Sequence, residues 1–379
     1  MPMIAIRVDA STQIGSGHLM RCLALASQLR AGGAQVCFIC REHPGHLCNT
    51  ITDEWKFPVH RLPCDADWKV AKDGSITHAA WLGADWEDDA RETVAAIASR
   101  FGRADWLVVD HYALDAQWES ALKQSYRQLM VIDDLADRNH DCDILLDQNF
   151  YLDQCRRYDG LLPPRAQLLL GPRYALLRTE FLQAQQSLRT RDGTIRKILM
   201  YFGSSDISNE TAKAMRAIRA IGRPDIAVDM VIGPTNAHRS QLEKLAACWP
   251  SLRLYFGADM ARLIGDADLG IGAGGATTWE RCLLGLPTLT VVVATNQLET
   301  TLAVASLGAL WYLGLGQDLS EADYRAAVEK RMQDPEDVRG KSLKALEIMK
   351  LDGVRSAASL LLDYTDRTPK ATGAGIANR

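Results

Sequence analysis

The sequence lacks several features that would each assign it to a class of protein. No segment approaches the roughly 18 consecutive apolar residues of a membrane-spanning helix, and the apolar run at its start is too short for a signal peptide. The net charge is only −4, which argues against a general binder of nucleic acid or anionic membranes. We therefore expect a cytoplasmic protein that neither inserts into a membrane nor binds nucleic acid.

Patterns that would hold a metal ion are equally scarce. The nine cysteines are scattered, and Cys37 and Cys40 form a C-x-x-C without a second pair at zinc spacing. Asp65-Ala66-Asp67 has the spacing of a divalent-ion motif, but it lies beside Pro63 in a poorly patterned loop. We expect free thiols, no metal site and no cofactor.

The sequence does contain a regular alternation of short apolar runs and helical patterns. It has 379 residues, 47% of them hydrophobic, which suits two globular domains. In the first half, helical patterns such as His18–Leu29 and Asp88–Ser99 separate predicted strands at Ile4–Val8, Val36–Ile39, Trp106–Asp110, Leu129–Ile132 and Ile144–Leu146. This order predicts a parallel sheet with helices on both faces.

The same pattern restarts in the second half. Helices such as Glu210–Ala220 and Thr278–Leu284 separate predicted strands at Ile198–Phe202, Val228–Ile232, Leu252–Phe256, Leu269–Gly272 and Thr288–Val293. Prolines and a glycine interrupt the segment between the series, so we expect domains at 1–175 and 176–365, with a tail at 366–379. The fold class expected is α/β of GT-B type, with two doubly wound, Rossmann-like domains facing a ligand-binding cleft.

A glycine loop follows the first predicted strand and ends at His18. Gly15 and Gly17 let backbone approach a ligand closely, and a helix begins directly after them. The positive end of that helix disfavours an imidazolium, so a neutral His18 is suited to act as a general base. The alternative is a histidine that only caps or packs the helix start.

A second glycine loop leads from a predicted strand into the helix at Thr278–Leu284. Amides of Gly275, Ala276 and Thr277, with the Thr277 and Thr278 hydroxyls, are suited to hold a diphosphate. Glu280 has two interpretations: it forms a capping box with Thr277, or it accepts the hydroxyls of a nucleotide ribose.

Two further loops end strands on the same predicted side. Asn296 and Gln297 follow the strand Thr288–Val293 and lie beside the second glycine loop, although an ordinary turn and helix cap also explains them. Gly203 and Ser204 follow the first strand of the second domain and are a further candidate phosphate contact. Turn chemistry alone explains this loop equally well.

Taken together, these strings resemble a known enzyme family. The strings that carry the resemblance are Arg7-Val8-Asp9, Gln13-Ile14-Gly15-Ser16-Gly17-His18, Val109-Asp110-His111-Tyr112, Ile132-Asp133-Asp134, Cys142 to Asn149, Gly171 to Arg178 and Asn296-Gln297. Together they resemble the UDP-2,4-diacetamido-2,4,6-trideoxy-β-L-altropyranose hydrolases. These enzymes belong to pseudaminic acid biosynthesis, which serves flagellin glycosylation. The similarity spans about residues 4–300. It departs at Gly-Gly-Ala-Thr-Thr, where some relatives have a serine-rich loop, and at Ser204, where relatives often have glycine.

The resemblance implies a chemistry and a set of site residues. Water attacks the anomeric carbon of a UDP-sugar with inversion, and UDP leaves, without a metal. The resemblance makes His18 the base and puts Tyr112 in the sugar pocket. It places Arg7, Asp9, Gly15, Gly17, Asn296 and Gln297 around the substrate, and Gly203, Ser204, Gly275, Ala276, Thr277, Thr278 and Glu280 around UDP.

Other functions fit the same architecture. A glycosyltransferase would use the same donor but needs an acceptor site and usually an apolar membrane-facing patch, and the first domain shows no basic amphipathic stretch. An epimerase of the same architecture would release a new UDP-sugar. A binding module without enzymatic activity leaves His18 and its loop unexplained. We expect a monomeric hydrolase whose partner is a small UDP-sugar.

Overall fold

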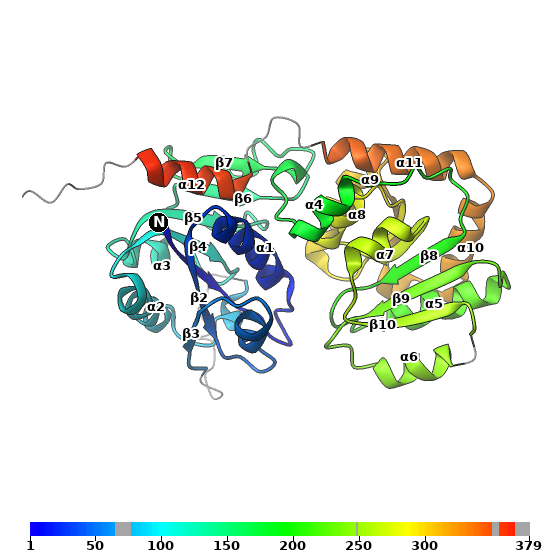
Figure 1. Cartoon of the computed structure of the whole chain (residues 1–379), viewed down its shortest axis with the longest axis horizontal. Coiled ribbons are helices and arrows are strands. Elements are labelled where there is room, and N and C mark those ends of the chain that lie inside the picture. Colours follow the sequence, from blue (N-terminus) through cyan, green and yellow to red (C-terminus); the bar gives the residue numbers. More distant parts are fainter. Residues whose placement is uncertain (65–76, 248, 351–355, 368–379) are drawn as a thin grey trace, which may run out of the picture.

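The computed structural model describes residues 1–64, 77–247, 249–350 and 356–367. It consists of two α/β bodies that lie side by side, each built on one parallel sheet (Figure 1). The α/β prediction of two doubly wound domains is confirmed.

The first sheet has seven strands in the order β3-β2-β1-β4-β5-β6-β7, and every pairing is parallel. The strands are β1 (Met3–Val8), β2 (Gln35–Arg41), β3 (Val59–Leu62), β4 (Ala104–Asp110), β5 (Tyr126–Ile132), β6 (Ile144–Asp147) and β7 (Gln167–Leu170).

Helices cover both faces of this sheet. Side chains of one face, such as Ile4 and Ile6, pack on α1 (Gly17–Ala31), whereas Ala5 and Val109 on the other face pack with α2 (Trp86–Phe101) and α3 (Ala116–Ala121). Short helical turns lie at η1 (Thr50–Glu54), η2 (Ala79–Trp81) and η3 (Pro172–Tyr174). The alternation along each strand therefore supplies two hydrophobic layers.

The second sheet has six parallel strands in the order β10-β9-β8-β11-β12-β13. The strands are β8 (Lys197–Tyr201), β9 (Ala227–Ile232), β10 (Leu252–Phe256), β11 (Leu269–Ala273), β12 (Thr288–Val292) and β13 (Trp311–Leu315). Around it lie α4 (Thr179–Gln185), α5 (Glu210–Ile221), α6 (Arg239–Ala246), α7 (Met260–Asp266), α8 (Thr277–Leu283), η4 (Thr295–Gln297), α9 (Leu298–Ser306), η5 (Gly316–Asp318), α10 (Glu321–Met332) and α11 (Pro335–Ile348).

The last described helix, α12 (Ala357–Arg367), returns to the first body. Ala357, Ala358 and Leu361 pack in the same hydrophobic cluster as α1, and the Leu361 carbonyl accepts a hydrogen bond from the Trp106 indole at 3.1 Å. Figure 1 shows this helix, in red, lying with the first body. The predicted domain limits at 175 and 365 stay a prediction, and this return of the chain was not foreseen.

Each sheet has a point where the winding direction reverses. In the first sheet β1 lies between β2 and β4, and in the second β8 lies between β9 and β11. Ligands of doubly wound folds bind at the carboxyl ends of strands around this point. Both predicted glycine loops follow strands at such a point, which makes the facing carboxyl edges the place to look for a site.

Candidate active site

His18 is held by a buried carboxylate at the reversal point of the first sheet. Its Nδ1 lies 2.6 Å from Oδ1 of Asp110, the last residue of β4. A carboxylate only accepts, so Nδ1 carries the hydrogen, and in the neutral ring the lone pair is then on Nε2. Burial alone would raise the pKa of Asp110, but the Arg21 guanidinium and His18 outweigh it and hold that pKa below its usual value. The pair is thus built to leave Nε2 as a proton acceptor.

Arg21 joins this pair to a second carboxylate. Its guanidinium donates to Asp110 at 2.6 and 2.7 Å and to Asp134 Oδ2 at 2.9 Å. The other Asp134 oxygen accepts the Tyr112 hydroxyl at 2.5 Å. Arg21 therefore fixes the orientation of the carboxylate that holds His18 and connects it to Asp134 and Tyr112.

Aromatic rings surround the His18 imidazole. The Tyr112 ring lies edge-on to it at 4.4 Å between centroids, and the Trp81 ring stacks on Tyr112 at 5.5 Å. His78 lies 4.5 Å from Trp81, and burial lowers the pKa of His78. These rings restrict the orientations that His18 and Tyr112 can adopt.

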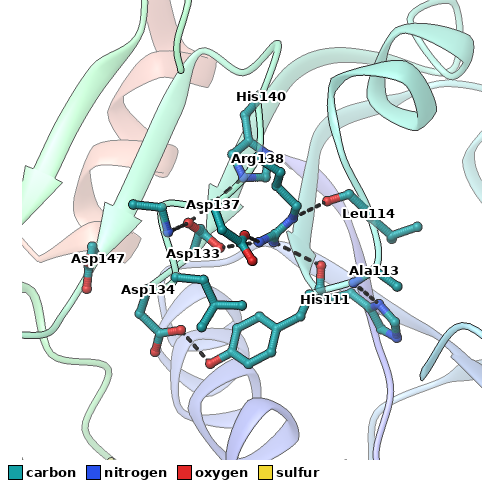
Figure 2. Close-up of polar contacts among 12 residues, drawn as sticks. His111, Ala113, Leu114, Asp133, Asp134, Asp137, Arg138, His140 and Asp147 are labelled. Atoms are coloured by element: carbon teal, nitrogen blue, oxygen red, sulfur yellow. Dashed lines mark hydrogen bonds and ion pairs between the residues drawn. The ribbon is translucent and has the colours of Figure 1, made fainter. Parts of the chain in front are cut away.

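The loop that carries Tyr112 is fixed by Arg138. Figure 2 shows this guanidinium between the loop after β4 and the loop after β5. It donates to the carbonyls of Leu114 at 2.7 Å and His111 at 3.2 Å, and it pairs with Asp133 at 2.8 Å. Two strand ends are thereby joined beside the candidate base.

Arg7 and Asp9 lie beneath the first glycine loop rather than on its surface. Their exposed fractions are 0% and 1%. Arg7 pairs with Asp89 at 2.7 Å and with Asp9 at 2.6 Å, and Asp9 also accepts the Arg41 amide at 2.7 Å. In this structure both side chains have protein partners, so they support the loop, and the prediction that they contact substrate is not tested.

The first glycine loop touches the Gly203–Ser204 loop of the second body. Ser16, the residue before α1, lies 2.8 Å from Ser204 between their hydroxyl oxygens. Gly15 and Gly203 have φ angles of +81° and +92°, a region that glycine adopts readily, and Gly17 begins α1. Gly233 supports the Ser204 loop, because a Cβ there would lie 2.4 Å from the Ser204 Cα. The structure therefore brings together Gly15, Gly17, His18, Gly203 and Ser204.

The second glycine loop is closely packed against Gln297. A Cβ on Gly274 would lie 3.2 Å from the Gln297 Cβ and 2.8 Å from the Thr301 hydroxyl, and Gly275 has a φ of +105°. The Gln297 side-chain oxygen accepts the Val293 amide at 3.1 Å. Its neighbour Asn296 is exposed. The predicted proximity of this loop to the Asn296-Gln297 turn is thus present.

The residues after this loop differ in their exposure to solvent. Ala276 is exposed and Thr277 is half-buried, whereas the Thr278 hydroxyl is buried and accepts Arg281 at 3.2 Å. Arg281 also donates to the Ala273 carbonyl at 2.7 Å. Thr278 therefore helps fix the loop, while Ala276 and Thr277 are the members with surface to offer a ligand.

Glu280 bonds Arg178 and forms no capping box. Ala276 is the residue before α8, and no side chain caps this helix. The carboxylate lies 3.5 Å from the Arg178 guanidinium, which comes from the segment joining the two bodies. Burial raises the pKa of Glu280 to about 7, although Arg178 opposes the shift. The capping alternative is therefore excluded in this structure, and the ribose role stays a prediction.

The described residues contain no cluster of side chains suited to a metal ion. Across residues 1–64, 77–247, 249–350 and 356–367, no group of three or more His, Cys, Asp or Glu side chains is arranged to hold a metal. Asp65 and Asp67 lie outside the described residues. The cysteines that the structure describes are free thiols, Cys37 and Cys40 among them. In the same part of the chain, no helix is both long and apolar enough to cross a membrane.

Sequence reasoning missed the groups that hold the site together. Asp110, Arg21, Asp134 and Asn149 form a connected polar network around His18, and no role was predicted for them. One signal was available, because Asp110 and Asp134 come at or just after the ends of neighbouring strands. Trp81 gave no signal, since a single tryptophan in an irregular segment is not informative.

Comparisons with known proteins test the resemblance drawn from the motifs. No family model matches the chain. The chain is 25% identical over 307 residues to the UDP-2,4-diacetamido-2,4,6-trideoxy-beta-L-altropyranose hydrolase of Campylobacter jejuni, covering 80% of this chain and 97% of that protein. This similarity confirms the resemblance drawn from the motifs.

Solved structures of the same fold are more distant in sequence. MurG of Acinetobacter baumannii has a TM-score of 0.62 at 14% identity, covering 97% of this chain and all (100%) of that one. UGT89C1 of Arabidopsis thaliana, in complex with UDP, has a TM-score of 0.65 at 14% identity and covers 96% of this chain and 98% of its own. The chain therefore has the GT-B fold and is similar over most of its length to a UDP-sugar hydrolase.

Proposed function

We propose that this protein is an enzyme that hydrolyses a UDP-sugar between the anomeric carbon and the UDP oxygen. The substrate proposed is UDP-2,4-diacetamido-2,4,6-trideoxy-β-L-altropyranose, an intermediate of pseudaminic acid biosynthesis, by analogy with the Campylobacter relative. The sugar binds on the first body beside His18 and Tyr112, and the uridine binds on the second body beside the Gly274–Thr277 loop.

The observation that carries the proposal is the His18–Asp110 pair. Its Nδ1–H contact at 2.6 Å leaves Nε2 free to take a proton from water. The water oxygen then forms a bond to the anomeric carbon from the face opposite UDP, and the bond to the UDP oxygen breaks with its electron pair. The products are UDP and the free sugar with inverted configuration, and His18 returns its proton to solvent.

The second body supplies the means to hold the leaving group. Loop amides at Gly275, Ala276 and Thr277, with the Ser204 loop opposite, are suited to bear the charge that develops on the diphosphate. Glu280, whose carboxylate lies 3.5 Å from the Arg178 guanidinium, is proposed to accept the ribose hydroxyls. No step in this scheme calls for a metal or a cofactor, and we propose that the enzyme works without either.

A transferase is the second candidate, because MurG shares the fold. The assay that separates the two is incubation with a panel of UDP-2,4-diacetamido sugars in buffer alone, followed by NMR of the products. The proposal predicts UDP and an inverted free sugar without any acceptor. Release of UDP only after an acceptor is added would establish a transferase, and a new UDP-sugar would establish an epimerase.

A further inference from the structure

One side chain connects the two bodies directly to the network around His18. Asn149, just after β6, accepts a hydrogen bond from the Trp279 indole at 3.1 Å and donates its amide to Asp134 Oδ2 at 3.2 Å. An indole N–H only donates and a carboxylate only accepts, so both contacts fix the same orientation of the carboxamide. Asn149 is therefore a defined link rather than an amide free to turn over.

Each end of this link is tied to a functional loop. Trp279 belongs to the first turn of α8, directly after the second glycine loop, and its indole is 1% exposed within the hydrophobic cluster that packs α8. Because it is packed on all sides, the indole moves with α8. The position of the Asn149 amide is thus fixed relative to α8, the helix on the nucleotide side.

The other end reaches the candidate base through charged groups. Asp134 holds the Tyr112 hydroxyl and the Arg21 guanidinium, and Arg21 holds Asp110. Asp110 in turn orients His18. If Asn149 lost its partner on α8, its carboxamide would be free to turn, so its donation to Asp134 would weaken and the orientation of that carboxylate toward Tyr112 and Arg21 would loosen.

We propose that Asn149 is a positioning residue that aligns His18 and Tyr112 with the nucleotide-side helix α8. The alignment is complete only when the two bodies adopt the arrangement seen here, so the base is correctly oriented in the closed enzyme. This inference rests on the proposed function, since it assigns His18 the role of base. Asn149 is not among the predicted nucleotide contacts, so its loss affects turnover rather than UDP binding.

An ion pair between the bodies provides a matched control. Arg157 and Glu299 pair at 2.9 Å and the Glu299 side chain is 64% exposed, while Arg157 donates to the Asp134 carbonyl at 3.1 Å rather than to its carboxylate. Glu299→Gln removes a bond between the bodies without removing a donor to the Asp134 carboxylate. The Glu299→Gln variant therefore measures the effect of losing a contact between the bodies that does not involve the Asp134 carboxylate.

The test is a double-mutant cycle of Asn149→Ala and Trp279→Phe, with Glu299→Gln beside it. Each of the two single variants should lower kcat about tenfold, while KM and the calorimetric UDP affinity stay within about twofold. The double variant should lose no more than either single one, a coupling of about 1.4 kcal/mol. Glu299→Gln should keep kcat within about twofold. Additive losses, or an equal loss in Glu299→Gln, would overturn the proposal.

A second readout does not need turnover and separates this inference from the proposed function. The imidazole signals of His18, observed by NMR, should shift when UDP is added to the wild-type protein and shift by less than about half as much in Asn149→Ala, which still binds UDP. An unchanged shift in the variant would contradict the inference. Absence of hydrolysis by the wild type would contradict only the proposed function. If Trp279→Phe fails to fold, Asn149→Ala alone still decides, because its side chain is only half-buried.

Discussion

The two glycine loops follow strands beside the reversal point of their sheets, β1 in the first and β11 in the second, but they are supported in different ways. The loop before His18 lies over buried charges, among them Arg7, Asp9 and Asp110. The loop before α8 is packed with small residues, hydroxyls and amides, and its one buried charged support named above is Arg281, which donates to the Ala273 carbonyl. This difference leads us to expect that the first body controls a proton, whereas the second body receives a ligand.

The physical cost of these two designs also differs. Buried charges are costly unless each has a partner, and Asp110 has Arg21 and His18 while Asp9 has Arg7. These partners hold the pKa of Asp110 and of Asp9 below the usual value in spite of burial. Glu280 has only one weak partner, and its pKa is raised. We therefore expect substitutions in the first body to change the rate of the reaction and substitutions in the second body to change the affinity for UDP.

The largest effect is expected at His18. His18→Ala removes the proton acceptor and should lower kcat by roughly 100-fold to 10,000-fold, the contribution of a general base. UDP affinity, measured by calorimetry, should change little because the imidazole lies on the first body. His18→Asn serves as a polar control with the same expected loss. Near-normal turnover in either variant would refute the role of His18.

Asp110→Asn should give the next largest effect. An amide can donate to Nδ1, which would put the lone pair on the wrong ring nitrogen and lower kcat by about tenfold to 100-fold. The matched control is Glu92→Gln, since Glu92 pairs at 2.8 Å with the nearby Arg41 but lies outside the His18 network. Stopped-flow or steady-state rates should be unchanged in the control. Equal losses in both variants would mean that Asp110 is only structural.

Glu280→Gln tests the second body. A neutral amide accepts ribose hydroxyls less strongly than a carboxylate, so UDP affinity at pH 8 should fall about tenfold, which corresponds to about 1.4 kcal/mol. Glu180→Gln is the control, because Glu180 also pairs with Arg178, at 2.8 Å, but is exposed. Calorimetric titration of both variants should find a loss only in Glu280→Gln. Unchanged affinity would remove Glu280 from the site.

The pH dependence of UDP binding sharpens the same point. The pKa of Glu280 is raised to about 7, so the carboxylate is ionised above that pH and neutral below it. Wild-type affinity should therefore fall as the pH is lowered from 8 to 6, and the difference from Glu280→Gln should disappear at pH 6. The raised pKa also means that ionising Glu280 costs stability, so wild-type stability relative to the variant should fall as pH rises from about 4.5 to 7. A pH-independent affinity difference would contradict this assignment.

Metal removal is expected to have the smallest effect. The phosphate site is proposed to use loop amides and hydroxyls, so treatment with EDTA should leave kcat and KM unchanged. The measurement is a rate assay before and after chelation and with added Mg²⁺. A loss of activity that Mg²⁺ restores would show that the phosphate site needs a cation.

Much of the fold was predictable because its strands are buried on both faces. Runs such as Val36–Ile39 and Leu129–Ile132 are continuous and apolar, which is typical of a parallel sheet, and both lie in strands of the first sheet. The strands missed are the edge strands β3, β7 and β13, which have weaker patterns: β3 is short and carries His60 and Arg61, β7 has four residues, and β13 carries Gly314. Edge strands bury less, so composition marks them less clearly.

The site was predictable only where backbone chemistry leaves a signature. Glycine loops and a helix start are visible in sequence, and they led to His18 and Gly275. The contacts of Asp110 with Arg21 and of Asn149 with Trp279 join residues far apart in the chain, so spacing does not reveal them. The capping box expected as one alternative at Glu280 fails because α8 begins at Thr277, one residue earlier than that motif requires.

The most direct test of the account is hydrolysis of the UDP-sugar in H₂¹⁸O. Water attack on the anomeric carbon predicts ¹⁸O on the anomeric position of the released sugar, with inverted configuration, and none in the UDP, as read by mass spectrometry and ³¹P NMR. His18→Ala should show the same labelling at a much lower rate. Appearance of ¹⁸O in the β-phosphate of UDP would contradict attack at the anomeric carbon and with it the role proposed for His18.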